Sequence, residues 1–416
     1  CRMTEAIRVL HFADIHIGME NYGKTDPQTG LSSRVVDFLR RMDTMIEMAR
    51  ERDVDLVIFA GDAFKTRAPN PTYQREFAHR IRDLSELAPV VMLVGNHDLP
   101  PTQLKASSIE IYDTLRVPNV RVAANYEVIV EHTKRGPVAV GTAPYPIRSR
   151  MLEDERTAGM TIAQTDAMLQ NILSDELERL AADADQYAMP RLLTGHFTVN
   201  GAVFGSERGI MLGRDIQVML SSLADSRWDY VALGHIHKHQ NLTKGQQGVP
   251  PVVYSGSMER IDFGEEGDPK GFCWVELARG ETEWTFEALP ARPFVTLTAD
   301  LRRSANPTEQ VLKLIKKHQL DEAVVRLQLE LSAETEARLN ETTIRDELKQ
   351  AGVFQMAAIR KQIEQPVRAR LGGSPEGLTP VELLERYLIS KEIPLDRREA
   401  LMDAAQNIIE SATERE

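Results

Sequence analysis

Short apolar runs recur along the first 290 or so residues, and most of them end in Gly, Asp, Asn or His. Runs of Val, Ile and Leu of this length are typical of strands that are buried on both faces. They cover residues 7–14, 56–62, 90–98, 138–145, 191–196 and 230–235. Between several of them the apolar positions follow helical spacing, as in 32–53, 72–86 and 160–183. This alternation predicts an α/β fold with a layered sheet.

The pattern changes towards residue 290, where strand-like pieces follow one another without such helices. These pieces cover 251–257, 272–278 and 283–290, and they complete a first domain at residues 1–290. Residues 291–368 then predict a compact α+β module that begins with a strand. Its further elements are helices at 307–319 and 334–350 and strands at 324–331 and 353–359.

The last part of the chain predicts a linker and a pair of short helices. Gly, Ser and Pro mark the linker at 369–378, and the helices fall within 379–416. Thr379 suits the N-cap position, and Glu382 completes a capping box with it. A hairpin this small buries too little apolar area to be stable alone. Its apolar stripes therefore pack either on the rest of the chain or on another protein.

Composition and charge narrow the class of protein. The 416 residues are 42% hydrophobic and 27% charged, as in a globular protein with a core. Cys1 and Cys273 are far apart, no run is long enough to span a membrane, and no basic-then-apolar leader is seen, so we expect a cytoplasmic protein. The net charge of −12 argues against a passive nucleic-acid coat, but not against an enzyme that meets phosphates through bound metal ions.

Side chains able to bind metal follow five of the predicted strands. They are Asp14 and His16, Asp62, Asn96, His196, and His235 and His237, with His97 next to Asn96. Ligands of open α/β sheets bind beyond the carboxyl ends of the strands, so we expect these side chains to converge. Gly precedes four of them, and we expect it to permit a sharp turn. Each motif alone is weak, but the ordered combination predicts a metal site.

The donor types indicate which metal and how many ions. Carboxylate, imidazole and amide groups without thiolate suit Mn²⁺, Fe or Zn²⁺ better than Mg²⁺ alone. Seven donors exceed the needs of one four-coordinate ion and suit two ions about 3.5–4 Å apart that share a carboxylate.

The stretch "DYVALGHIHKHQ" (229–240) places three histidines at alternate positions. On an extended backbone they would share one side, with about 7 Å between His235 and His237. That spacing suits two neighbouring ions better than one. We expect His239 to be a polar residue on the outgoing loop, because no partner carboxylate is apparent for it.

The motifs Asp-x-His, Gly-Asp, Gly-Asn-His-Asp, Gly-His and Gly-His-x-His, in this order, resemble those of the calcineurin-like metallophosphoesterases. That family implies a sandwich of two mixed sheets flanked by helices. The segments "LHFADIHIG" (10–18) and "YSGSMERIDFGEE" followed by "KGF" (254–272) look like the SbcD branch, bacterial relatives of a double-strand-break repair nuclease. The resemblance covers residues 5–290. The α+β module is similar to the family's DNA-contacting capping domain, and the final hairpin to the segment that docks onto the coiled-coil ATPase SbcC.

The resemblance assigns a role to each candidate residue. Asp14, His16 and His237 would hold one ion, Asn96, His196 and His235 the other, and Asp62 would bridge them. His97 would be no ligand but the catalytic group that stabilises the phosphoryl charge or protonates the leaving oxygen.

Five neighbouring positions carry weaker expectations. Asp98 either orients His97 or is a simple turn or surface carboxylate. Lys65 stands where some relatives have a histidine, and we expect a solvated loop residue there. Ser257, Arg260 and Phe263 lie in a motif near the family's active site, without an assigned role.

The resemblance implies a two-metal, Mn²⁺-dependent phosphodiesterase that cleaves DNA, as an exonuclease on duplex ends and an endonuclease on single strands and hairpins. It would act as a homodimer with an SbcC-type ATPase in DNA repair, in the cytoplasm at the nucleoid. Two alternatives share the motifs: a small-substrate or phosphoprotein phosphoesterase, and a non-catalytic scaffold of the repair complex. The extra residues after 290 favour the nuclease over the first, and the complete ligand set with His97 argues against the second.

Overall fold

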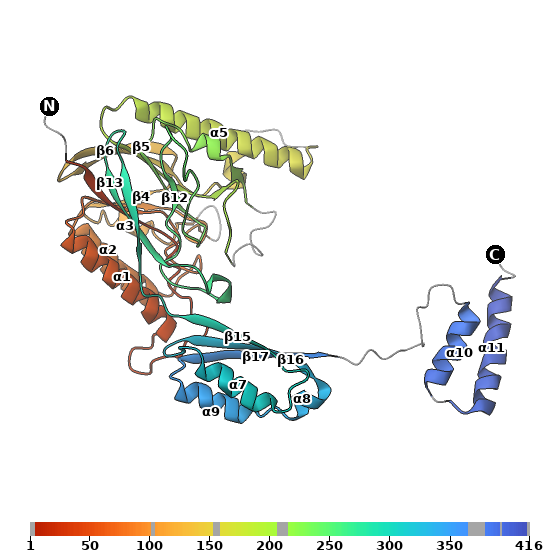
Figure 1. Cartoon of the computed structure of the whole chain (residues 1–416). Coiled ribbons are helices and arrows are strands. Elements are labelled where there is room, and N and C mark those ends of the chain that lie inside the picture. The colour runs from red at the N-terminus through yellow and green to blue at the C-terminus, as the bar shows by residue number, and fades with distance from the viewer. Residues whose placement is uncertain are drawn as a thin grey trace. The chain divides into compact units, whose positions relative to one another are not determined.

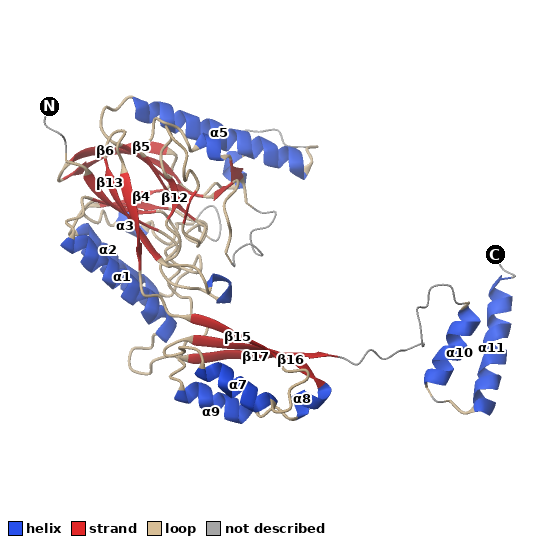
Figure 2. Cartoon of the chain, in the orientation of Figure 1, coloured by secondary structure: helices blue, strands red, loops and turns tan. Residues whose placement is uncertain are grey.

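The structure is a computed structural model that describes residues 5–100, 105–152, 159–205, 215–364, 379–391 and 393–413. Two six-stranded sheets form its centre (Figures 1 and 2). The first sheet has the order β14-β13-β1-β2-β3-β4. Its strands are β1 (Ile7–Phe12), β2 (Leu56–Phe59), β3 (Val90–Leu93), β4 (Val120–Ala123), β13 (Gly271–Leu277) and β14 (Glu283–Ala288). β1 to β4 run parallel, and β13 and β14 are antiparallel additions.

The second sheet has the order β11-β12-β10-β7-β6-β5 and is also mixed. Its strands are β5 (Glu127–Thr133), β6 (Gly136–Ala143), β7 (Arg191–His196), β10 (Tyr230–Gly234), β11 (Gln240–Asn241) and β12 (Val252–Tyr254). β6, β7, β10 and β12 are parallel to one another. A two-stranded pair, β8 (Thr198–Val199) with β9 (Gln217–Val218), follows the end of β7.

Side-chain alternation along the strands produces the layers. Val9, Ile58 and Ala232 face a core between the two sheets, whereas Leu10 and Phe59, on the opposite faces of their strands, join a core under the first pair of helices. Those helices are α1 (Ser33–Glu51) and α2 (Pro71–Ser85), and α5 (Ile162–Asp185) covers the second sheet. The short elements α3 (Ile111–Thr114), α4 (Arg148–Met151), η1 (Leu220–Ser222) and η2 (Phe263–Glu265) complete this region. The predicted sandwich of two mixed sheets flanked by helices is thus confirmed.

Three further strands form a separate sheet in the order β15-β16-β17. The elements here are β15 (Phe294–Asp300), α7 (Pro307–Lys316), β16 (Val324–Ser332), α8 (Ala333–Ala337), α9 (Glu341–Gln350) and β17 (Gln355–Glu364). The single helix predicted at 334–350 is wrong, because the chain breaks between α8 and α9. There the Asn340 N–H donates to Thr308 Oγ1 at 2.9 Å, and the same hydroxyl donates to the Arg338 carbonyl. These bonds replace helical ones.

The chain divides into two compact units. One comprises Cys1–Leu297, Leu314–Leu327 and Thr342–Ile359, and the other Thr298–Lys313, Gln328–Glu341 and Arg360–Glu416. This division cuts through the third sheet, and the four predicted domains stay a prediction.

The C-terminal hairpin consists of α10 (Pro380–Ser390) and α11 (Leu395–Thr413). Thr379 Oγ1 accepts from the Glu382 N–H, and the Glu382 carboxylate accepts from the Thr379 N–H, so the predicted capping box is present. The predicted linker, residues 369–378, lies outside the described residues. Among the helices that the structure describes, none has the length and apolar character needed to cross a membrane.

Candidate metal centre

All seven predicted ligands lie at the carboxyl ends of neighbouring strands. They follow β1 (Asp14 and His16), β2 (Asp62), β3 (Asn96), β7 (His196) and β10 (His235 and His237). The parallel strands of the two sheets end at a common edge, which is why residues more than two hundred positions apart can meet there. Apart from Asn96, these side chains belong to residues that are at least nine-tenths buried.

The backbone at this edge adopts an unusual conformation. Asp14, His16, Asp62 and His235 have positive φ angles of 54°, 48°, 65° and 96°. Such angles cost about 1–3 kcal/mol each and persist only where neighbouring contacts fix them. Two such contacts are the hydrogen bonds from the Asp14 N–H to the Gly61 carbonyl and from the His16 N–H to the Asp62 carbonyl. The turns of β1 and β2 therefore hold each other in place.

The glycines before the ligands serve two purposes, and the prediction of sharp turns is right at only one of them. Gly61, before Asp62, has a φ of 98°. Gly95 and Gly234 are needed for close approach instead. A Cβ on Gly95 would lie 2.2 Å from Asp62 Oδ1, and one on Gly234 would lie 2.1 Å from the Ala60 carbonyl oxygen. Any side chain there would push ligand-bearing strand ends apart.

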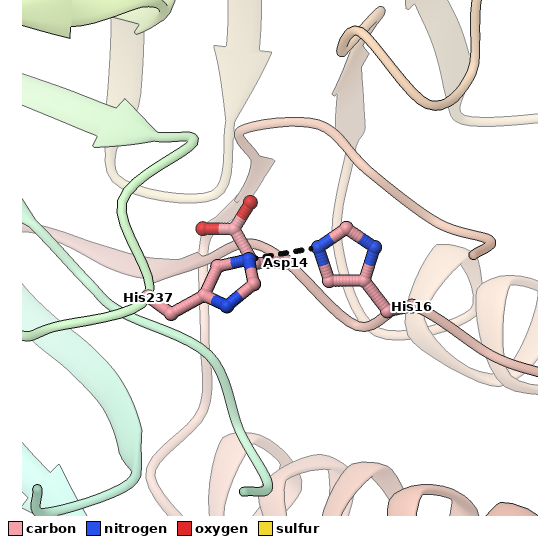
Figure 3. A group of neighbouring side chains, drawn as sticks. All are labelled: Asp14, His16 and His237. Atoms are coloured by element: carbon pink, nitrogen blue, oxygen red, sulfur yellow. Dashed lines mark hydrogen bonds between the residues drawn. The ribbon is translucent and has the colours of Figure 1, made fainter. Parts of the chain in front are cut away.

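Asp14, His16 and His237 form the first group of donors (Figure 3). One ligand atom from each lies within 4.8 Å of the others. The Nε2 atoms of His16 and His237 are 3.0 Å apart, and their rings face each other across the site. The Asp14 carboxylate also accepts from the His235 N–H at 3.1 Å, which fixes its direction. These three side chains can hold one ion.

Asn96, His196 and His235 form the second group. Asn96 Oδ1 lies 3.0 Å from His196 Nε2 and 3.0 Å from His235 Nδ1. Asp62 lies between the two groups, with Oδ2 at 3.4 Å from His196 Nε2 and 3.7 Å from His16 Nε2. This is the position that a carboxylate shared by two ions would take.

Asp62 is held as a carboxylate. Burial alone would raise its pKa, but the nearby His196, His97 and His16 lower that pKa well below the ordinary value. Burial likewise opposes protonation of His196, yet Asp62 prevails and raises the pKa of His196 to about 9. An ion that took the Nε2 lone pair of His196 would therefore displace a proton.

The outer nitrogens of three histidines are fixed by acceptors, and this fits metal binding. His237 Nδ1 lies 2.8 Å from Glu265 Oε1, His235 Nε2 lies 2.8 Å from Asp215 Oδ2, and His196 Nδ1 lies 2.6 Å from the Ala60 carbonyl oxygen. Ligating histidines almost always donate their second N–H in this way, because the bond fixes the tautomer and the ring. The donor set and its supports therefore suit two divalent ions.

The same region decides the family. Residues 7–239 match the model of the calcineurin-like phosphoesterases. The chain belongs to this family. The SbcD component of nuclease SbcCD from Escherichia coli (strain K12) is 30% identical over 316 residues, which cover 73% of this chain and 74% of that protein. The protein of the same name from Bacillus subtilis (strain 168) is 27% identical over 282 residues, or 66% and 67% of the two chains. DNA double-strand break repair protein Mre11 of Methanosarcina acetivorans is 23% identical over 423 residues, or 99% of this chain and 60% of that protein.

His97 lies beside both donor groups of this phosphoesterase. Its backbone N–H donates to Asp62 Oδ1 at 2.8 Å, and its Nδ1 lies 2.7 Å from the Lys65 carbonyl oxygen. A carbonyl only accepts, so Nδ1 carries a proton there. The ring is 4.8 Å from that of His16, edge to face. Lys65 thus matters through its backbone, which its side-chain chemistry could not reveal.

Asp98 does not orient His97, and it is not a surface carboxylate either. It is fully buried, and its two oxygens accept from the backbone N–H groups of Asp62, Ala63 and Gly95 at 2.8, 3.0 and 3.1 Å. Burial and the charge of Asp62 raise the pKa of Asp98 to about 6. The residue therefore holds the turn of the bridging carboxylate.

The three histidines of the quoted stretch do not lie on one extended strand, so that expectation is wrong. β10 ends at Gly234, and the positive φ of His235 turns the chain. His239 leaves the site altogether: its ring stacks on Phe286 at 3.9 Å, and its Nδ1 bonds to the Tyr254 carbonyl. It packs on the edge of the first sheet, as a half-buried polar residue.

The sequence motif around 257–270 contains residues whose partners become visible only in the structure. Ser257 Oγ accepts from Lys270 Nζ at 2.8 Å, and Phe263 packs edge to face on Phe294. The Arg260 guanidinium donates to four backbone carbonyls, those of Glu265, Asp268, Ala291 and Arg292. These residues fix the loop rather than point into the centre.

Sequence reasoning missed Glu265 and Asp215, the two carboxylates behind His237 and His235. Glu265 lies within the quoted "YSGSMERIDFGEE", where its position in a family motif was a usable signal. Asp215 follows no apolar run and offered none. It reaches His235 because β9, two residues later, pairs with β8 just beyond His196.

Proposed function

We propose that this chain is a DNA nuclease: a phosphodiesterase that uses two divalent ions, Mn²⁺ by preference. The observation that carries the proposal is the pair of donor groups that share Asp62, with His97 beside them. Two ions held there would supply Lewis acidity and an activated water for in-line attack on a phosphodiester. DNA is proposed as the substrate because the relatives that match most of the chain are named as nucleases and a break-repair protein.

The residues of the chain divide the work as follows. Asp14, His16 and His237 bind one ion, Asn96, His196 and His235 bind the other, and Asp62 contacts both. His97 keeps its Nδ1 proton on the Lys65 carbonyl, which leaves Nε2 to face the phosphate. From there it stabilises the charge that develops on phosphoryl oxygen or gives a proton to the leaving oxygen. The proposed products are those of an exonuclease on duplex ends and an endonuclease on single strands and hairpins.

The test uses purified chain, Mn²⁺ and an end-labelled DNA hairpin, with wild type and His97→Ala side by side. We expect cleavage by wild type that EDTA abolishes, and a loss of about 10²–10⁴-fold in His97→Ala, the range of general acid catalysis. The variant should still bind both ions. Absence of cleavage by wild type, with or without an SbcC-type ATPase, would refute the nuclease proposal. Undiminished cleavage by the variant would refute the role of His97 alone.

The C-terminal hairpin is proposed to dock onto the coiled coil of an SbcC-type ATPase. The support is its exposed apolar surface: Tyr387 and Ile389 are 50% exposed, Leu395 63% and Leu401 42%. Burying such side chains against a partner is favourable by about 25 cal/mol per Å². The partner also explains how an acidic chain could engage DNA, since the partner can supply much of the cationic surface.

Leu395→Glu and Leu401→Glu should abolish capture of the ATPase in a pull-down, because each buries a charge in the proposed contact. Ile162→Glu, at an 80% exposed position at the start of α5, is the matched control and should leave capture unchanged. Deletion of 376–416 should also abolish capture and leave metal binding intact. Capture that survives the deletion would show that the hairpin is not the docking site.

A homodimer acting at the nucleoid is proposed on the same resemblance. The exposed Ile111 and Leu115 at α3, at 50% and 69%, offer an apolar surface for a second copy. Light scattering after gel filtration should give twice the chain mass of 46.8 kDa. A Leu115→Glu variant should give the single mass. If both samples give the single mass, the dimer proposal is wrong.

A further inference from the structure

Glu265 lies directly behind His237, on the side away from the metal centre. Its Oε1 is 2.8 Å from His237 Nδ1. An ionised carboxylate only accepts, so Nδ1 carries the proton and Nε2 keeps its lone pair. Nε2 is the atom that faces His16 Nε2 at 3.0 Å. Glu265 thus decides which nitrogen of His237 is available to an ion.

Lys270 locks Glu265 in that position. Its Nζ is 2.9 Å from Glu265 Oε2 and also donates to the His237 carbonyl at 3.1 Å and to Ser257 Oγ at 2.8 Å. Glu265 Oε2 accepts in addition from the Ile261 N–H at 2.9 Å. Both charged side chains are fully buried. A buried pair with its partners satisfied is rigid, because moving either group would leave a charge unpaired.

Asp215 has the corresponding place behind His235, but at the opposite ring nitrogen. Its Oδ2 is 2.8 Å from His235 Nε2, whereas His235 Nδ1 faces Asn96 Oδ1 at 3.0 Å. Asp215 Oδ1 accepts from the Tyr145 hydroxyl at 2.8 Å, and Oδ2 also accepts from Thr198 Oγ1 at 3.1 Å. The two histidines of the Gly-His-x-His motif therefore present different nitrogens to the centre.

The two supports are built from separate parts of the chain. Glu265 belongs to η2 and bonds to Ile261 and Lys270, beside the start of β13. Asp215 precedes β9, and its partners Tyr145 and Thr198 follow β6 and β7. A change in one support leaves the hydrogen bonds of the other in place.

We propose that Glu265 and Asp215 are positioning residues that act on different ions: Glu265 through His237 on the first, and Asp215 through His235 on the second. The inference rests on the proposed two-ion function. Its consequence is that the affinities of the two ions are set independently, each by one carboxylate that touches no ion. Loss of such an outer partner typically costs about 10–100-fold in metal affinity.

The experiment measures Mn²⁺ binding to the metal-free full chain by calorimetry and by the EPR signal of free Mn²⁺. Glu265→Ala and Asp215→Ala are each made in wild type, in a His237→Ala background and in a His235→Ala background. The His237→Ala background removes a ligand of the first ion, so the tighter remaining ion reports on the second group. The His235→Ala background does the reverse. Glu265→Gln, which keeps the volume, replaces Glu265→Ala if circular dichroism shows that the alanine variant does not fold.

In His237→Ala, adding Asp215→Ala should weaken the remaining ion by about 10–100-fold, and adding Glu265→Ala should change it less than about threefold. In His235→Ala the two outcomes should be exchanged. Equal effects of both carboxylates in both backgrounds would overturn the proposal, because each would then act on the centre as a whole. Two ions bound with unchanged affinity in the Glu265 and Asp215 single variants would also overturn it. Failure of wild type to bind two ions would instead refute the proposed function.

Discussion

Acidification should destabilise this protein through His11, a histidine that lies between the two sheets rather than in the metal centre. The side chain is fully buried, its Nε2 lies 3.2 Å from the Leu233 carbonyl oxygen, and its Nδ1 lies 3.2 Å from the Tyr230 hydroxyl. The carbonyl can only accept, so Nε2 carries the proton and Nδ1 accepts from Tyr230. His11 thereby ties β1 to β10, the strands that deliver Asp14 and His235.

Burial lowers the pKa of His11 to about 3, although the bond to the Leu233 carbonyl opposes the shift. In the unfolded chain the pKa is about 6.5. Below about pH 6.5 the unfolded state therefore binds a proton that the folded state does not, and the free energy of unfolding falls with falling pH by about 1.4 kcal/mol per pH unit. Between about pH 8 and about pH 4.5 this single group removes about 2.7 kcal/mol.

The assay compares wild type with His11→Gln in urea at the same two pH values, with EDTA present so that metal-linked protons do not contribute. Glutamine keeps a donor for Leu233 and an acceptor for Tyr230 but does not titrate. Other titrating groups cancel in the difference between the two proteins. We expect that difference to shift by about 2.7 kcal/mol in favour of the variant at the acidic pH. A shift within about 0.5 kcal/mol would refute the reasoning.

Three further predictions concern the centre and the core. Asp62→Asn should weaken both ions by more than the about 10–100-fold expected for an outer partner, and a Mn²⁺ titration in which one ion keeps its affinity would contradict the shared carboxylate. Gly234→Ala should lower the free energy of unfolding by about 1–3 kcal/mol or more, because its Cβ would lie 2.1 Å from the Ala60 carbonyl oxygen. The control is Gly267→Ala, where a Cβ meets nothing within 4 Å, and equal melting temperatures for the two variants would show the contact to be harmless. Leu173→Ala, in the buried face of α5, should cost about 2–5 kcal/mol in urea unfolding without changing Mn²⁺ affinity, and an altered affinity would mean that the α5 core supports the centre.

The order of the elements could be predicted because the signals for it are local. Apolar runs of strand length and helical spacing at 32–53, 72–86 and 160–183 match β-strands and the helices α1, α2 and α5. The donor residues were visible for the same reason, since each stands just after an apolar run and the carboxyl ends of parallel strands meet. The helix at 334–350 failed because the hydroxyl of Thr308, about thirty residues away, bonds the backbone at the break.

The sequence by itself determined the fold class, the set of candidate donors and the family. Only the tertiary structure decided how the donors are held. It turned the chain at His235 by a positive φ, sent His239 to Phe286, and gave Asp98 three backbone N–H groups. It also chose Nε2 of His237 and Nδ1 of His235 as the inward nitrogens. The reason is physical: a tautomer is set by the partner of the other nitrogen. Those partners, Glu265 and Asp215, come from segments that only packing brings near.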